Sequence, residues 1–512
     1  MLLIAGLIAP ADAQMQQEYR LVIPGKQSDR PYDIISMGSD GLALVRDLQK
    51  FSQGNKKWSV EFLDTTLNRF WSRELDLDSR LNLVGFEHLP DRLYLLFRES
   101  QTTYLNFQLA TLFFRRDSVQ VDKVRFDLNF QLTHFTVAGT TALFGGYINS
   151  EAAVLLYNHT SDHPKVLPGL FTKDISLLDL RANVNNSFNV LLLEKRRSDH
   201  QLLMIRTFDT DGNLLVDDEI PVDSRYTILS GITSRLVHEE MMIAGTYGEG
   251  NSNDALGIYS VAVDPFNDQP VHYHDIGSIS HFLDYLPEKK AGKVRDKINR
   301  EKTSGKVPNF EANLLPIRLA EEGNGYYLFT EAFHPPSNVT YYPYGNPAWN
   351  SFYYPYATPG NPYRSSTFDN PYYPGTARNS EVKMIQSFVM RFRSPSSIPE
   401  GASLSFDNVR RPMLDQTGDF IVRKDSILLA YKYKSDIVYQ HESEDPMIRS
   451  LPEKTKAQLG QSSDILKDEE DEGGLRFWFG RHFYAWGYRR VKITLEDDVE
   501  SRYEFYVNRL DF

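Results

Sequence analysis

The 512-residue chain contains no cysteine. This absence excludes disulfide bonds, thiolate metal sites and cysteine nucleophiles, because all three require the thiol group. Apolar side chains must therefore hold the fold together without covalent cross-links. They make up 41% of the sequence, which is enough for a large core.

Long apolar runs and the common catalytic motifs are also missing. No stretch reaches the ~18 apolar residues that a membrane-spanning helix needs, so we expect no transmembrane segment in the mature chain. The sequence contains neither the Gly-x-Ser-x-Gly motif of serine hydrolases nor a glycine-rich phosphate-binding loop. The net charge of −12 argues against general nucleic-acid binding, which relies on basic side chains that neutralise phosphates.

The first 13 residues have the features of a secretory signal peptide. Met1 to Ala13 form an apolar run that ends in the small-x-small sequence Ala11-Asp12-Ala13, as at a cleavage site. The basic segment that usually precedes such a run is missing, which a start codon placed too late would explain. We therefore predict export in a Gram-negative bacterium, to the periplasm or in association with the outer membrane.

A polar turn followed by an apolar run recurs seven times along the chain. The first two runs begin at Leu42 and Leu93, directly after Asp40-Gly41 and Asp91-Arg92. The other five runs begin at Ala142, Phe188, Met241, Tyr326 and Ile427. The first five runs are about 50 residues apart, and the last two spacings are longer. Strands and turns with this period are typical of β-propellers, in which each repeat forms one four-stranded blade.

These repeats resemble the β-propeller superfamily over about Tyr19 to Phe512. The resemblance is architectural, because the chain has no WD40, kelch or sialidase signature. It implies an all-β fold, a single seven-bladed propeller, with six or eight blades as alternatives. Tyr19 to Ile23 should form the strand that pairs with the last blade and closes the ring.

Three irregular segments interrupt the repeats. Residues 280–308 are rich in Lys, Arg and Glu and predict a charged insertion, possibly helical, with a basic face. This face is either solvated or in contact with an acidic surface or lipid head groups. Residues 335–374 form a Tyr/Pro-rich insertion, and residues 441–474 form an acidic loop.

The Tyr/Pro-rich insertion is the strongest functional signal. It contains nine Tyr and nine Pro, and proline at this density excludes regular helix or sheet. Tyrosine offers a large rigid contact surface, and proline lowers the entropy cost of ordering a loop. The insertion packs on the propeller itself, binds a protein partner or membrane-protein rim, or stacks on a glycan. The predicted binding residues are Tyr341, Tyr342, Tyr344, Trp349, Tyr353, Tyr354, Tyr356, Tyr363, Tyr372 and Tyr373.

Two short patterns have an alternative interpretation as metal sites. Asp209-x-Asp211-Gly212-Asn213 could offer oxygens to Ca²⁺, but the flanking strands indicate a hairpin turn. His272 and His274 could place two imidazoles on one side of a strand, without an evident third zinc ligand. We therefore assign no metal, no cofactor and no catalytic residue.

The sequence thus predicts a non-catalytic binding or scaffold protein of the bacterial cell envelope, in which the aromatic insertion docks a protein partner. The alternative is a carbohydrate-active enzyme that uses carboxylates in the central channel. Three or more carboxylates converging in a deep channel would favour the enzyme. A channel plugged by apolar side chains would favour the scaffold.

Overall fold

The computed structural model describes residues 15–99, 106–126, 130–160, 164–170, 174–196, 200–236, 240–250, 254–264, 266–306, 308, 310, 312–323, 325–334, 382–411, 414–423, 426–443, 450–457, 465–469, 473–495 and 498–512. The Tyr/Pro-rich insertion and parts of the acidic loop lie outside the described residues.

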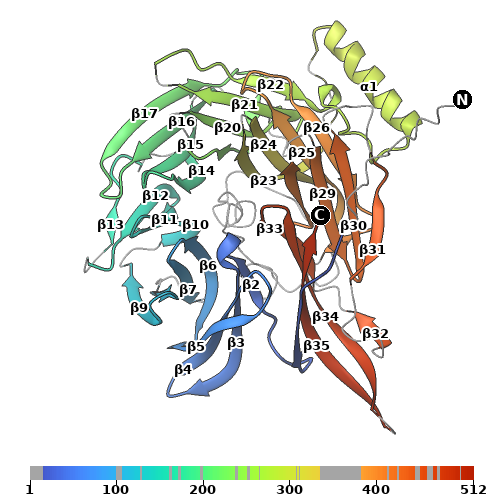
Figure 1. The fold of residues 1–512 in the computed structure, drawn as a ribbon. Helices are drawn as coiled ribbons and strands as arrows, with labels where there is room; N and C mark the ends of the chain where they lie inside the picture. Colours follow the sequence, from blue (N-terminus) through green and yellow to red (C-terminus); the bar gives the residue numbers. More distant parts are fainter. Residues whose placement is uncertain are drawn as a thin grey trace, which may run out of the picture.

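The described strands form eight antiparallel sheets that follow one another around a ring (Figure 1). In most sheets the first strand lies closest to the axis of the ring, and in the sheet that contains both chain ends the innermost strand is β33 (Gly474–Phe479). The chain is therefore a β-propeller, as the repeats predicted. We call the sheets blades 1 to 8 in the order of their innermost strands along the chain.

Blades 1 to 4 are each built from four consecutive strands. Blade 1 contains β2 (Asp33–Ser36), β3 (Leu42–Ser52), β4 (Asn55–Leu63) and β5 (Arg69–Asp78). Blade 2 contains β6 (Leu81–Leu89), β7 (Arg92–Glu99), β8 (Asn106–Phe113) and β9 (Ser118–Arg125). Blade 3 contains β10 (Phe130–Ala138), β11 (Thr141–Ile148), β12 (Glu151–Tyr157) and β13 (Lys165–Val166). Blade 4 contains β14 (Ile175–Ala182), β15 (Phe188–Lys195), β16 (Gln201–Phe208) and β17 (Leu214–Pro221).

Blades 5 to 8 are less regular, because several include an additional short strand. Blade 5 contains β18 (Thr227–Ile228), β19 (Ile232–Thr233), β20 (Met241–Gly248), β21 (Gly257–Val263) and β22 (His272–Asp275). Blade 6 contains β23 (Asn313–Glu322), β24 (Gly325–His334), β25 (Val382–Phe392), β26 (Glu400–Ser405) and β27 (Arg410–Arg411). Blade 7 contains β28 (Gly418–Arg423), β29 (Ser426–Tyr433), β30 (Asp436–Ser443) and β31 (Glu453–Lys456). Blade 8 contains β33 (Gly474–Phe479), β34 (His482–Leu495), β35 (Asp498–Asp511), β32 (Ile465–Glu469) and β1 (Arg20–Gly25).

The two ends of the chain meet in blade 8 and close the ring. Strand β1 pairs antiparallel with β35, with Arg20 opposite Asn508 and Gly25 opposite Tyr503. The predicted closing strand, Tyr19 to Ile23, is thereby confirmed within one or two residues at each end. Closure leaves no blade without a neighbour on either side, so the apolar faces of all sheets can be buried.

The described residues form eight blades, the alternative that the repeats left open, and not the seven that were counted, because the eighth repeat was not counted. Its second strand follows the turn Gly480-Arg481 and begins His482-Phe483-Tyr484, about 56 residues after Ile427. The run is aromatic, like the counted run that begins at Tyr326 and unlike the other six. Phe483 and Tyr484 are buried, and they pack in the two clusters that join blade 8 to blades 7 and 1.

Burial follows the position of each strand in its blade. All eight residues of β11 are buried, whereas β17 exposes most of its residues. Strands packed on both faces require continuous apolar runs, and outer strands need only one apolar face. Between blades, aromatic rings fill the space, as where Trp58 of blade 1 meets Phe97 of blade 2 with ring centroids 5.1 Å apart.

One helix interrupts the described strands. Residues between blades 5 and 6 form the 3₁₀ turn η3 (Ile276–Ser278) and helix α1 (Glu288–Thr303). Ala291 and Ile298 anchor α1 in the core cluster shared by blades 5 and 6. Glycine at position 277 permits this close packing, since a Cβ there would lie 2.6 Å from Cδ1 of Ile298. No described helix is both long enough and apolar enough to cross a membrane.

Candidate functional site

The ten predicted binding residues, Tyr341 to Tyr373, all lie outside the described residues. The structure describes only the two ends of their segment. The chain leaves blade 6 at His334, the last residue of β24, and re-enters it at Val382, the first residue of β25. His334 pairs with Lys383, so the insertion joins two adjacent strands at one edge of the ring.

Several carboxylates of the innermost strands are buried against neighbouring blades. Glu87 of β6 accepts a 2.8 Å hydrogen bond from the hydroxyl of Thr136 on β10. Burial raises the pKa of Glu87 to about 7, and the Thr136 bond and the charges of Arg235 and Arg181 offset this only in part. Asp179 of β14 is fully buried, and burial raises its pKa to about 6.

We call Glu87, Asp179 and Asp419 the axial carboxylates, and each of them accepts a hydrogen bond from a neighbouring blade. Asp179 accepts bonds of 2.8 and 2.7 Å from the backbone N–H and hydroxyl of Thr233 on β19. The buried guanidinium of Arg181 donates to the carbonyl oxygens of Thr233 and of Leu319 on β23. It also lies 3.8 Å from the carboxylate of Glu321. We call these contacts of Asp179 and Arg181 the axial network. It connects the innermost strands of blades 4, 5 and 6.

A second buried group connects blades 6, 7 and 8. Asp419 of β28 accepts a 2.9 Å bond from Arg318 of β23 and another of 2.9 Å from the backbone N–H of Phe477 on β33. Glu331 of β24 accepts bonds of 2.7 and 2.9 Å from the backbone N–H groups of Gly418 and Thr417. Burial raises the pKa of Glu331 to about 7. These side chains satisfy backbone donors across the blade boundaries.

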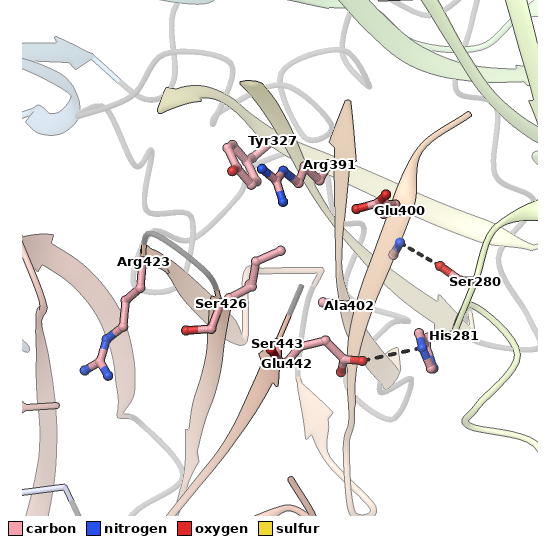
Figure 2. Close-up of a pocket in the computed structure, with 12 residues that line it drawn as sticks. Ser280, His281, Tyr327, Arg391, Glu400, Ala402, Arg423, Ser426, Glu442 and Ser443 are labelled. Atoms are coloured by element: carbon pink, nitrogen blue, oxygen red, sulfur yellow. Dashed lines mark hydrogen bonds and ion pairs between the residues drawn. The ribbon is translucent and has the colours of Figure 1, made fainter. Parts of the chain in front are cut away.

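A pocket of about 180 Å³ lies between blades 6 and 7. Figure 2 shows Arg391 beside Tyr327 at one end, and Glu442 beside His281 at another. Tyr327 and Arg391 are opposite each other on β24 and β25 at the end of blade 6 remote from His334. The pocket is therefore separated along the strands from the point where the Tyr/Pro-rich insertion attaches.

His281 connects the segment before α1 to the pocket wall. Its Nδ1 lies 2.9 Å from Oδ2 of Asp284, and its Nε2 lies 3.4 Å from Oε1 of Glu442 on β30. Its φ of 61° is in the left-handed region, which histidine adopts at a cost. The hydroxyl of Ser280 accepts a 2.8 Å bond from the backbone N–H of Gly401.

The pocket lining offers charges of both signs to a small polar molecule. Arg391 and Arg423 are cationic, and Glu400 and Glu442 are anionic. Burial and the nearby charge of Arg481 lower the pKa of Arg423. Glu400 already has a partner in Arg393, at 3.0 Å.

The two patterns with an alternative metal interpretation have other roles. Oδ1 of Asp209 accepts bonds from the backbone N–H groups of Asp211 and Asn213, as in the predicted hairpin turn. His274 is buried with Nε2 3.0 Å from the hydroxyl of Ser260, while His272 is partly exposed. Within the described part of the chain, no three His, Cys, Asp or Glu side chains gather as metal ligands would.

Sequence reasoning missed the axial network. A signal was present, because Asp179 and Arg181 alternate with leucines inside an otherwise apolar run. Such charges in a central strand need partners, since burying an unpaired charge is very costly. The partners, Thr233 and Leu319, are 54 and 138 residues away from Asp179 and Arg181, so the sequence does not identify them.

No protein-family model and no curated protein matches this chain. Solved structures resemble its fold at a distance, including three with the following identities, coverages and TM-scores. The polysaccharide lyase Uly1 is 6% identical with a TM-score of 0.37, over 97% of this chain and 99% of that one. A prolyl endopeptidase is 10% identical with a TM-score of 0.39, over 90% of this chain and 53% of that one. An acylaminoacyl peptidase of Pyrococcus horikoshii is 7% identical with a TM-score of 0.33, over 82% and 52%. The chain spans about half the length of the two peptidases, and likeness at this level indicates no activity.

Proposed function

We propose that this protein is a non-catalytic binding or scaffold protein of the bacterial cell envelope, and that its Tyr/Pro-rich insertion docks a protein partner. The proposal is best supported by the partners of the axial carboxylates, because these partners belong to neighbouring blades. Asp179 and Asp419 bind backbone and side-chain donors of neighbouring blades, and Glu87 binds Thr136 in the same way. These groups connect neighbouring blades and leave recognition to what protrudes from the ring.

The attachment of the insertion supports a docking role. It is attached to the ends of two paired strands, β24 and β25, in which most residues are buried. A rigid base limits the entropy that an aromatic loop loses when it binds, which favours affinity. The signal-peptide-like residues Met1 to Ala13 support placement in the cell envelope.

The carbohydrate-active alternative has one supporting observation. A carboxyl group with a pKa near 7, such as that of Glu87, suits a general acid. A general acid must reach its substrate, however, and Glu87 is only 7% exposed. Arg181 and Arg235 also stabilise the charged form of this group, which opposes that role.

Replacing residues 335–381 by a short Asn- and Gly-containing turn tests the proposal. Because His334 and Lys383 are already paired, such a turn can join the strands without disturbing the blade. We expect an unchanged melting temperature and loss of partner capture, measured by crosslinking and mass spectrometry on native membranes.

A second variant keeps the length of the insertion and changes its ten predicted binding residues to serine. Loss of capture in both variants would assign recognition to the aromatic rings. Capture that survives in both variants would refute the docking role. A well-folded deletion variant that cleaves polysaccharides, with activity abolished by E87Q, would replace the proposal with the enzyme.

A further inference from the structure

Helix α1 concentrates positive charge on an acidic protein. Its 16 residues include seven basic and three acidic side chains, a net charge of +4, whereas the whole chain has a net charge of −12. Figure 1 shows the helix at the outer rim of the ring, beyond β22 and β26. Ala291 and Ile298 bury one side of it, so the opposite side is directed away from the propeller.

The basic residues of α1 fall into two groups that differ in their partners. Arg295 and Lys302 lie near the propeller and pair with Asp284 and Asp275. The other five form what we call the basic stripe, namely Lys289, Lys290, Lys293, Lys297 and Arg300. All five are exposed, and at 3.6 residues per turn they share an arc of about 100° of the helix surface.

Most of the basic stripe lacks a counter-charge. Lys297 lies 3.8 Å from Glu301 on the same helix. No carboxylate among the described residues pairs with Lys289, Lys290, Lys293 or Arg300. The stripe extends about 16 Å along the helix at 1.5 Å per residue. Like charges at this spacing repel one another, and an anionic surface facing them would offset this repulsion.

We propose that the basic stripe of α1 binds the protein peripherally to an anionic lipid bilayer. Lysine supplies four of the five charges, and lysine is depleted in protein–protein interfaces. Its ammonium group is a point charge on a flexible stem, which suits a diffuse layer of head groups better than a shaped partner. The stripe includes no aromatic or large apolar side chain, so the attachment is electrostatic and reversible.

This inference does not depend on the Tyr/Pro-rich insertion, and its test can fail independently of the proposed function. The full chain is sedimented with vesicles of phosphatidylcholine alone or of phosphatidylcholine with phosphatidylglycerol. We expect binding only to the anionic vesicles at low ionic strength, and release at about 0.5 M salt, where the Debye length is below ~8 Å.

The variant K289Q/K290Q/K293Q removes three stripe charges and keeps good helix-forming side chains. It should bind anionic vesicles at least tenfold more weakly, since each basic residue near such a surface contributes to attraction. The matched control K50Q/K123Q/K195Q removes the same charge from exposed positions on blades 1, 2 and 4 and should bind like the unaltered protein.

Three outcomes would overturn the proposal. The unaltered protein would fail to bind anionic vesicles, or the two triple variants would lose binding equally. In the third, the protein would bind immobilised polyglutamate through the stripe but not vesicles, which would assign the surface to an acidic polypeptide.

Discussion

At the scale of single residues, the ring contains buried carboxyl groups whose pKa values are raised above their ordinary range. Burial raises the pKa of Glu87 and Glu331 to about 7 and that of Asp179 to about 6. Their hydrogen bonds to neighbouring blades lower these pKa values, but by less than burial raises them. Burial of these carboxyl groups therefore lowers the stability of the fold at neutral pH, at positions where hydrogen bonds connect strands of different blades.

This cost depends on pH in a defined direction. In the unfolded chain Glu87 releases its proton near its ordinary pKa of 4.5, whereas in the fold it does so only near 7. The unfolded state is therefore favoured as the pH rises from 4.5 to 7, and the stability that Glu87 provides below pH 4.5 is lost. The difference corresponds to about 3 kcal/mol at neutral pH.

The variant E87Q carries a permanently neutral group and should escape this loss. Its melting temperature minus that of the unaltered protein should increase between pH 4.5 and pH 7.5, as measured by calorimetry. The control E74Q, at an exposed position paired with Lys57, should show no such increase. A difference for E87Q that stays constant with pH would contradict the raised pKa of Glu87.

At the scale of elements, the longest strands belong to blade 8. Strands β34 and β35 contain 14 residues each, and β1 adds the other end of the chain to their sheet. In the register of this pairing Leu21 lies opposite Val507. Since opposed residues of antiparallel strands are about 4.5–5.5 Å apart, these two positions are suitable for an engineered disulfide.

The variant L21C/V507C would contain the only two cysteines of the chain, so no other pairing could compete. The disulfide would cross-link almost the whole chain into one loop, and long loops gain most, typically about 2–4 kcal/mol. We expect the oxidised form to melt at a higher temperature than the reduced form. Equal melting temperatures in fully oxidised and reduced samples would mean that β1 does not hold the ring closed.

The same scale shows why one repeat was overlooked. Seven repeats begin with apolar runs after short polar turns, six of them mainly aliphatic and the one at Tyr326 mainly aromatic, and these predicted their strands correctly. The eighth begins with Phe483, Tyr484 and Trp486, whose rings satisfy the same burial requirement. Aromatic runs after a turn must therefore be counted together with aliphatic ones when blades are predicted from a sequence.

At the scale of the whole molecule, the ring depends on its last blade. The cluster between blades 8 and 1 combines Trp478, Tyr484 and Trp486 with Leu42 and Leu44. The indole of Trp478 also donates a 2.9 Å hydrogen bond to the carbonyl oxygen of Gly41. Without blade 8, the apolar faces of blades 1 and 7 would be exposed to water.

A chain that ends at residue 457 tests this dependence, since it retains blades 1 to 7 and lacks β32 to β35. We expect it to aggregate or to form soluble oligomers, as measured by size-exclusion chromatography with light scattering. A monodisperse monomer with a cooperative melting transition would show that seven blades can close by themselves and would contradict the role of blade 8.

The sequence alone determined the blade architecture and the pairing of the chain ends. Both follow from local features, namely polar turns, apolar runs and their period, which each segment contains within itself. The charged segment near residues 280–308 was likewise recognisable from composition. Its basic stripe required the structure, because only packing shows which side of α1 is buried.

Tertiary structure decided the number of blades, the axial network and the pocket between blades 6 and 7. Asp179 and Thr233, or His281 and Glu442, are distant in the chain and meet only because the ring closes. Such contacts depend on the rotation of one blade against the next, to which every interblade core contributes. No local pattern contains that information.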